Sequence, residues 1–337
     1  MRRGELLSRR AILASAAAVA ACSRRGAPSA SDAPLASASA SASASASASA
    51  PVSESESESE SESASASSDA LAIRTLAFDR AHGGPQLAVC LVPSWGARFP
   101  LLVALHGLGE ARKGLEGGAW GWVRDYWLDR AIARLRNPPL ETRDFQGFVA
   151  PKRLAALNAS LADRPFRGLV VACPYTPDLL AERTLDNAGP FARFVTEELL
   201  PRARAELPVE SDAAHTGIDG VSLGGRVSLL VGLPRAHVFA AVGTLQPAIR
   251  VEESEPLAAR GRAYAAARPS GRLRLLTSDG DPFRPAVGAL HDALTAAGVA
   301  HEHLVVVGPH NYAFNRGPGG IEMLFWHDRV LRGQKGL

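Results

Sequence analysis

Short apolar runs recur along the chain from Leu71 onward, and most are separated by stretches with the spacing of amphipathic helices. The first runs are joined by short turns such as His82–Pro85, which predicts an antiparallel hairpin at a sheet edge. The later runs alternate with helical stretches, which predicts parallel strands. About eight strands are expected: Leu71–Phe78, Gln86–Val92, Leu101–Leu105, Leu169–Cys173, Thr216–Val221, Phe239–Leu245, Arg272–Thr277 and His303–Val307.

The segment from Leu71 to Leu337 has the length of one α/β domain with a mostly parallel sheet flanked by helices. The stretch 110–165 is long for the connection between the third and fourth strands, and we expect it to form a helical cap over the site. It carries Trp120, Trp122, Tyr126 and Trp127. We favour these aromatic residues as packing for the cap, with stacking on a sugar or an aromatic acyl group as the alternative.

The part of the chain before Leu71 has a different pattern. Ser8–Leu13 resembles a twin-arginine export motif, and Leu13–Ala21 is an apolar run too short to span a bilayer. Val19–Cys22 resembles a bacterial lipobox. The sequence therefore predicts an export signal over 1–21 and a lipid on Cys22, which would anchor the protein in the cell envelope, periplasmic or at the cell surface. The alternative for Cys22 is a free thiol beside an ordinary cleavage site.

The segment from Cys22 to Ala70 continues with Ser-Ala repeats and a Ser-Glu run over 53–63. Such a composition buries too little apolar surface to fold, so 22–70 is predicted to be a disordered tether between the anchor and the domain.

Charge and cysteine content narrow the function. The chain has a formal net charge of +3, and the predicted signal itself carries +3, so the remainder is close to neutral. The sequence pI of about 9.0 therefore gives no support for nucleic-acid binding. Cys90 and Cys173 lie in apolar strands, where they would either pair in an oxidising compartment or remain buried free thiols.

The most informative motif is Gly220-Val221-Ser222-Leu223-Gly224, a G-x-S-x-G sequence between a predicted strand and a predicted helix. A tight strand-to-helix turn would hold Ser222 in a strained conformation as a nucleophile, and the two glycines would avoid a steric collision. The helix N-terminus would point the N–H of Leu223 toward the reacting oxygen. The alternative is an ordinary glycine-rich turn.

A second motif, His106-Gly107-Leu108-Gly109, ends a buried strand. Its glycines would let the backbone turn so that the Leu108 N–H faces the cleft, with His106 packed or hydrogen-bonded beneath the loop. Leu108 and Leu223 are thus the candidate oxyanion donors.

An acid and a base are expected downstream of the serine, each just beyond a strand. His310 is the predicted base. Asp281, before Pro282, is preferred over Asp279 as the acid. The other histidines, including His291, His301, His303 and His327, are expected to be surface or core residues.

Together these segments resemble the α/β-hydrolase superfamily and, within it, the esterases that include esterase D-like and feruloyl-esterase-like enzymes. The resemblance rests on five segments: Leu105–Gly109, Asp219–Gly225, Phe239–Gly243, Asp281–Phe283 and Gly308–His310. The resemblance implies an α/β-hydrolase fold, in which Ser222 is the nucleophile, His310 the general base and acid, and Asp281 its orienting partner.

The sequence thus predicts a serine carboxylesterase that needs no metal or cofactor and acts through an acyl-enzyme on a small-molecule or polysaccharide-linked ester. Carbohydrate-linked, aromatic and short-chain esters are the expected substrates. Two alternatives remain: a serine peptidase of the same fold and a non-catalytic surface-binding lipoprotein.

Overall fold

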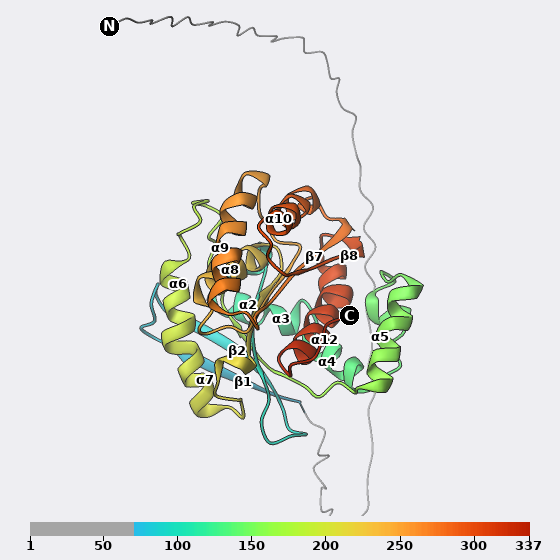
Figure 1. Cartoon of the computed structure of the whole chain (residues 1–337). Coiled ribbons are helices and arrows are strands. Elements are labelled where there is room, and N and C mark those ends of the chain that lie inside the picture. Colours follow the sequence, from blue (N-terminus) through green and yellow to red (C-terminus); the bar gives the residue numbers. More distant parts are fainter. Residues whose placement is uncertain (1–70) are drawn as a thin grey trace, which may run out of the picture. The chain divides into compact units, whose positions relative to one another are not determined.

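A computed structural model describes residues 71–337, so the predicted export signal, the lipidated Cys22 and the Ser/Ala/Glu-rich segment lie outside the described residues. The described part is built around one eight-stranded sheet (Figure 1). Its strands are β1 (Leu71–Phe78), β2 (Gln86–Pro93), β3 (Leu101–Leu105), β4 (Val170–Pro174), β5 (Thr216–Gly220), β6 (Ala241–Leu245), β7 (Arg272–Gly280) and β8 (Glu302–Pro309).

The strand order across the sheet is β1-β2-β4-β3-β5-β6-β7-β8. The pairs β1–β2 and β2–β4 are antiparallel, and every pair from β4 to β8 is parallel. The predicted edge hairpin and parallel sheet are therefore confirmed. β3 and β4 are apolar and buried along their whole length because helices cover both faces of the sheet.

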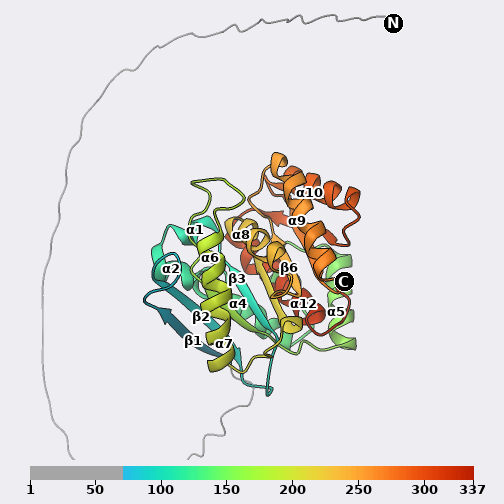
Figure 2. The same cartoon turned by 60° about the vertical axis from the view of Figure 1, so that its left-hand side comes forward.

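Helices form a layer on each face of the sheet, as Figure 2 shows. One apolar core joins the sheet to the layer that contains α6 to α10, and the other joins it to α3, α4, α5 and α12. The helices are α1 (Leu108–Ala111), α2 (Gly114–Ala119), α3 (Gly121–Arg124), α4 (Leu128–Arg136), α5 (Pro151–Asp163), α6 (Gly189–Arg193), α7 (Leu200–Glu206), α8 (Leu223–Gly232), α9 (Ser254–Ala267), α10 (Arg284–Ala296), α11 (Tyr312–Phe314) and α12 (Gly320–Val330), with short 3₁₀ or π segments η1 (Thr142–Phe145), η2 (Phe194–Leu199), η3 (Ala213–His215), η4 (Leu233–Arg235), η5 (Val251–Glu253) and η6 (Asn315–Gly319).

The long segment 110–165 is helical, as predicted, but most of it packs against one face of the sheet beside α12. Trp122 is fully buried there and meets Tyr126 edge-on, with ring centroids 4.9 Å apart. Trp120 stacks with Arg124, and Trp127 stacks with Arg130 and Arg316. Of the three tryptophans, only Trp122 packs in the core; Trp120 and Trp127 are half-buried against arginine side chains.

The two thiols do not pair. Cys90 on β2 and Cys173 on β4 are both free and buried. Cys90 lies opposite Ala172 and belongs to one core, whereas the next position of β4, Cys173, points into the other core. Alternation along a strand thus puts the sulfurs on opposite faces of the sheet. Burial raises the pKa of the Cys90 thiol to about 12 and also raises that of Cys173.

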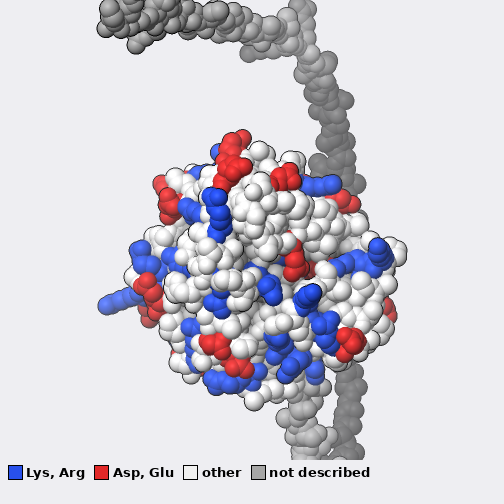
Figure 3. Space-filling model, in the orientation of Figure 1, with Lys and Arg blue, Asp and Glu red and all other residues white. Residues whose placement is uncertain are grey.

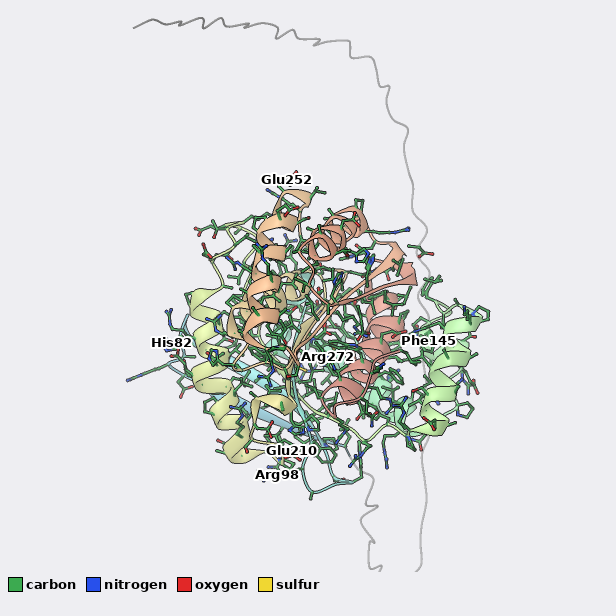
Figure 4. The ribbon with its side chains drawn as sticks, in the orientation of Figure 1. His82, Arg98, Phe145, Glu210, Glu252 and Arg272 are labelled. Carbon is green, nitrogen blue, oxygen red and sulfur yellow. The ribbon has the colours of Figure 1, made fainter. Side chains whose placement is uncertain are left out.

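The two ends of the sheet differ. Figure 4 labels Arg98 and Glu210, which precede β3 and β5, at the opposite end of the molecule from Glu252, which follows β6. The segments after β3, β5, β7 and β8 therefore converge near the Glu252 end.

Acidic and basic side chains are interspersed over the face in Figure 3. None of the helices within 71–337 has the length and apolar character needed to cross a membrane.

Candidate active site

The turn from β5 to α8 holds Ser222 in a conformation that serine rarely adopts, with φ 56° and ψ −113°. The turn is tight enough to require both flanking glycines. A Cβ on Gly220 would lie 2.5 Å from the carbonyl carbon of Gly224, and one on Gly224 would lie 2.2 Å from the Leu105 carbonyl oxygen. The N–H of Ser222 donates to the Leu245 carbonyl at 2.9 Å, which ties the turn to β6.

The structure brings Ser222 and His310 together although they are far apart in sequence. His310 Nε2 lies 3.1 Å from Ser222 Oγ, and His310 Nδ1 lies 2.9 Å from Asp281 Oδ1. The imidazole can therefore take the serine proton on one nitrogen while the carboxylate holds the other. The His310 side chain is 22% exposed and the Asp281 side chain 0% exposed, so the contacts run from a buried acid to the cleft.

Asp281, rather than Asp279, faces His310. Its carboxylate also accepts hydrogen bonds from Thr277 Oγ1 at 2.6 Å and from the Phe283 N–H at 3.0 Å. Asp279 instead accepts from the N–H of Gly308 at 2.9 Å. Asp279 lies within the last residues of β7 and Asp281 directly after the strand, and their carboxylates bind different partners.

The turn after β3 lies beside the serine. His106 is fully buried beneath it; its Nδ1 lies 2.9 Å from the Gly107 carbonyl, and its Nε2 accepts the N–H of Thr176 at 2.8 Å. Both contacts are satisfied by one neutral tautomer, in which Nδ1 carries the proton. Burial accordingly lowers the pKa of His106 to about 4. His106 is thus hydrogen-bonded beneath the loop, as expected.

The two candidate oxyanion donors occupy matching positions. Leu108 is the first residue of α1, and Leu223 is the first residue of α8. An N–H at the first position of a helix has no acceptor within that helix, so both groups can donate to a bound oxygen. A Cβ on Gly107 would lie 3.8 Å from the Ser222 Cβ, which shows how closely this turn approaches the serine.

A cleft of about 370 Å³ opens over these groups. Of the segment 110–165, only Glu110 and Tyr126 line it, so most of the predicted cap lies elsewhere. The cleft is lined by Gly107, Leu108, Gly109, Glu110, Tyr126, Val221, Ser222, His310, Asn311, Tyr312 and Asn315.

Sequence reasoning missed several side chains around this cleft. The carboxylate of Glu110 is buried between two tyrosine hydroxyls, from Tyr126 and Tyr312. Gln246 Nε2 donates to Ser278 Oγ at 2.6 Å and to the Pro309 carbonyl at 3.1 Å, next to His310. The only signal for Glu110 was an acidic residue directly after His-Gly-Leu-Gly. No local pattern marks Gln246.

The other predicted histidines lie away from this cleft. His327 is buried in α12, where its Nε2 lies 3.0 Å from Asp219 Oδ2. His291 on α10 contacts both His301 and His303, which lie before and in β8. Between Leu71 and Leu337 there is no group of three or more His, Cys, Asp or Glu residues arranged to hold a metal ion.

The sheet order, the strained serine turn and the Ser-His-Asp contacts define a serine hydrolase of the α/β-hydrolase fold. Residues 182–284, which include Ser222 and Asp281 but not His310, match the family described as "Putative esterase". No curated protein matches the chain.

Solved structures support the same fold. A ferulic acid esterase superposes with a TM-score of 0.59 at 14% identity, covering 78% of this chain and 99% of the other. The S-formylglutathione hydrolase FrmB of Staphylococcus aureus gives a TM-score of 0.56 at 14% identity, covering 77% and 98%. FphF, a fluorophosphonate-binding serine hydrolase of the same organism, gives 0.55 at 13% identity, covering 77% and 99%. At these identities the likeness establishes the fold.

Proposed function

We propose that the chain hydrolyses carboxylic esters through an acyl-enzyme on Ser222. The observation that carries this proposal is the continuous set of contacts from Ser222 Oγ through His310 to the buried Asp281. Serine is a weak nucleophile at neutral pH, so a base within hydrogen-bond distance is what the chemistry requires.

In the proposed reaction, His310 Nε2 takes the hydroxyl proton as Ser222 Oγ attacks the ester carbonyl. The negative charge on the carbonyl oxygen is stabilised by the N–H groups of Leu108 and Leu223. Collapse of the tetrahedral intermediate expels the alcohol, which receives the proton from His310. A water molecule, deprotonated by the same nitrogen, then attacks the acyl-enzyme. The acyl–Oγ bond breaks, His310 returns the proton to Ser222 Oγ, and the acid leaves. Asp281 stabilises the imidazolium in both halves.

The substrate class we propose is a carbohydrate-linked, aromatic or short-chain ester. Tyr312, Asn311 and Asn315 line the cleft, with the Tyr312 hydroxyl bonded to Glu110 and the Asn311 side chain bonded to the Ala313 N–H. A neighbour in fold is described as a ferulic acid esterase, which makes an aromatic acyl group a specific candidate.

A matched substrate panel tests this proposal. The protein is assayed with p-nitrophenyl acetate, p-nitrophenyl octanoate, methyl ferulate and an acetylated sugar, alongside peptide p-nitroanilides. We expect hydrolysis of esters that is lost in Ser222→Ala, and no hydrolysis of the anilides. Preferential cleavage of the anilides would instead establish a peptidase. No turnover of any ester by folded protein would favour a binding role.

For the part of the chain before Leu71 we propose export and a lipid anchor on Cys22, on the strength of the twin-arginine-like and lipobox-like motifs. Metabolic labelling with an alkyne fatty acid in a bacterial host tests the anchor. The wild-type chain is expected to incorporate the label and Cys22→Ser to lose it. Equal labelling of both would contradict a lipid on this cysteine.

A further inference from the structure

A buried carboxylate lies next to the proposed reaction centre and has no part in the Ser-His-Asp contacts. Glu110, on α1, is 1% exposed and lines the cleft. Each of its two oxygens accepts a tyrosine hydroxyl, and the two tyrosines come from distant parts of the chain. Burying a carboxylate is unfavourable unless it is paired and hydrogen-bonded, so these partners are what allow it to stay there.

Two hydrogen-bonded arms extend from Glu110, one through each tyrosine. The first arm runs through Tyr126 to the turn that carries Leu108. Tyr126 donates its hydroxyl proton to Glu110 Oε2, and the same hydroxyl oxygen accepts the N–H of Gly107 at 3.2 Å. Gly107 directly precedes Leu108, the proposed oxyanion donor. The hydroxyl therefore fixes the peptide just before the one whose N–H must point at the substrate.

The second arm leads to the histidine loop. Tyr312, although distant in sequence, donates its hydroxyl to Glu110 Oε1 at 2.7 Å. It begins α11, just after His310, and the Asn311 side chain between them caps that helix by accepting the N–H of Ala313 at 2.9 Å. One carboxylate thus joins the turn that carries Leu108 to the loop that carries His310.

Nearby charges favour the protonation states that both arms require. Lys113 Nζ lies 3.6 Å from Glu110 Oε1 and 2.7 Å from Asp125 Oδ2, which compensates the buried charge at its outer side. Burial and the neighbouring Glu110 charge raise the pKa of Tyr126 well above its usual value. Burial and the hydrogen bond to Glu110 also raise the pKa of Tyr312. Both phenols therefore keep the protons that they donate.

We propose that Glu110 is a positioning residue that, through Tyr126 and Tyr312, holds the Leu108 turn and the His310 loop in register across the cleft. This inference rests on the proposed function, since it assigns Glu110 a role in aligning the oxyanion donor with the base. Glu110 acts through these two tyrosines and does not itself contact the reacting atoms.

The test is a double-mutant cycle of Glu110→Gln and Tyr126→Phe in the full chain, with kcat and KM measured on p-nitrophenyl acetate. Glutamine keeps the shape of Glu110 but loses one acceptor, and phenylalanine loses the hydroxyl that bridges to Gly107. Because removing one oxyanion donor costs about 10²- to 10³-fold in kcat elsewhere, we expect each variant to lose about 10- to 100-fold in kcat. KM should change by less than about threefold, since the oxyanion forms only in the transition state.

The matched control is Tyr264→Phe on α9. Tyr264 is also buried, and its hydroxyl also makes one hydrogen bond, to the Phe239 carbonyl at 3.1 Å. This control is expected to lose stability comparably while retaining wild-type kcat. Thermal melting of all variants keeps any loss of folded protein separate from a loss of rate.

The outcomes are distinct. If Glu110 and Tyr126 act as one unit, kcat of the double variant is no lower than kcat of the slower single variant. Wild-type kcat in both single variants that remain folded would overturn the positioning role, as would a kcat loss in Tyr264→Phe of the same size. If Glu110→Gln does not fold, kcat of Tyr126→Phe alone still tests the positioning role. Inactive wild-type protein would contradict the proposed function instead.

Discussion

At the scale of single residues, two neighbouring carboxylates have different partners, which makes their roles separable. Asp281 orients His310, whereas Asp279 accepts the N–H of Gly308. Replacing Asp281 by Asn leaves a side chain of the same shape but favours the wrong imidazole tautomer. We expect Asp281→Asn to lower kcat by about 10⁴-fold, as in triads where this change has been made.

Asp279→Asn is the control for that change, and we expect it to lower kcat by less than about tenfold because the altered side chain does not contact His310. Steady-state kinetics on one ester measure both. A larger loss of kcat in Asp279→Asn than in Asp281→Asn would show that Asp279, and not Asp281, is the acid that orients His310.

His106 predicts how stability depends on pH. Its pKa is lowered by burial to about 4, while an unfolded histidine titrates near 6.5. Between these values the unfolded chain binds the extra proton and the folded protein does not, so stability falls as the pH drops from about 6.5 to 4. The two pKa values correspond to about 3 kcal/mol for this one group. Burial also lowers the pKa values of His327 and His303, which acts in the same direction.

Urea unfolding at pH 7 and pH 5 checks this expectation. His106→Gln is expected to have a smaller pH dependence of stability than the wild type. A wild-type protein equally stable at both pH values would rule out the buried neutral histidine as described.

At the scale of elements, the β5–α8 turn depends on backbone contact that leaves no room for a side chain. A Cβ on Gly224 would lie 2.2 Å from the Leu105 carbonyl oxygen, whereas one on Gly288 in α10 would meet nothing within 4 Å. Gly224→Ala is therefore expected to destabilise the fold by several kcal/mol, about 3 or more. Gly288→Ala should stabilise it by about 0.5–1 kcal/mol, as expected inside a helix.

Chemical denaturation of the two variants measures this difference. Similar free energies of unfolding for Gly224→Ala and the wild type would mean that the turn is looser than its contacts indicate.

The elements also show what the sequence could predict. All eight strands were expected from apolar runs, and the signal is most direct for β3 and β4, because a strand buried on both faces is continuously apolar. The meeting of Ser222, His310 and Asp281 followed from their places after strands. The position of the 110–165 helices could not be predicted, since the sequence of an amphipathic helix does not indicate which surface it packs against. The Glu110–Tyr312 contact was equally out of reach, because it joins distant parts of the sequence without any pattern.

At the scale of the whole molecule, the described residues contain two apolar cores, one on each side of a single sheet. A chain that starts at Leu71 keeps every strand of that sheet. We therefore predict that residues 71–337 fold cooperatively and hydrolyse p-nitrophenyl acetate with a kcat within about twofold of the full chain. Circular dichroism with melting, followed by the assay, tests both parts. An unfolded or inactive fragment beside an active full chain would show that the segment before Leu71 is needed.

Activation of Ser222 by His310 underlies the proposed reaction, and covalent labelling measures it without a substrate. The protein is treated with a fluorophosphonate probe, and the modified peptide is identified by mass spectrometry in wild type, Ser222→Ala and His310→Ala. We expect one adduct, on Ser222, that is lost in the first variant and strongly slowed in the second. Folded wild-type protein that does not label, or that labels at another residue, would contradict it.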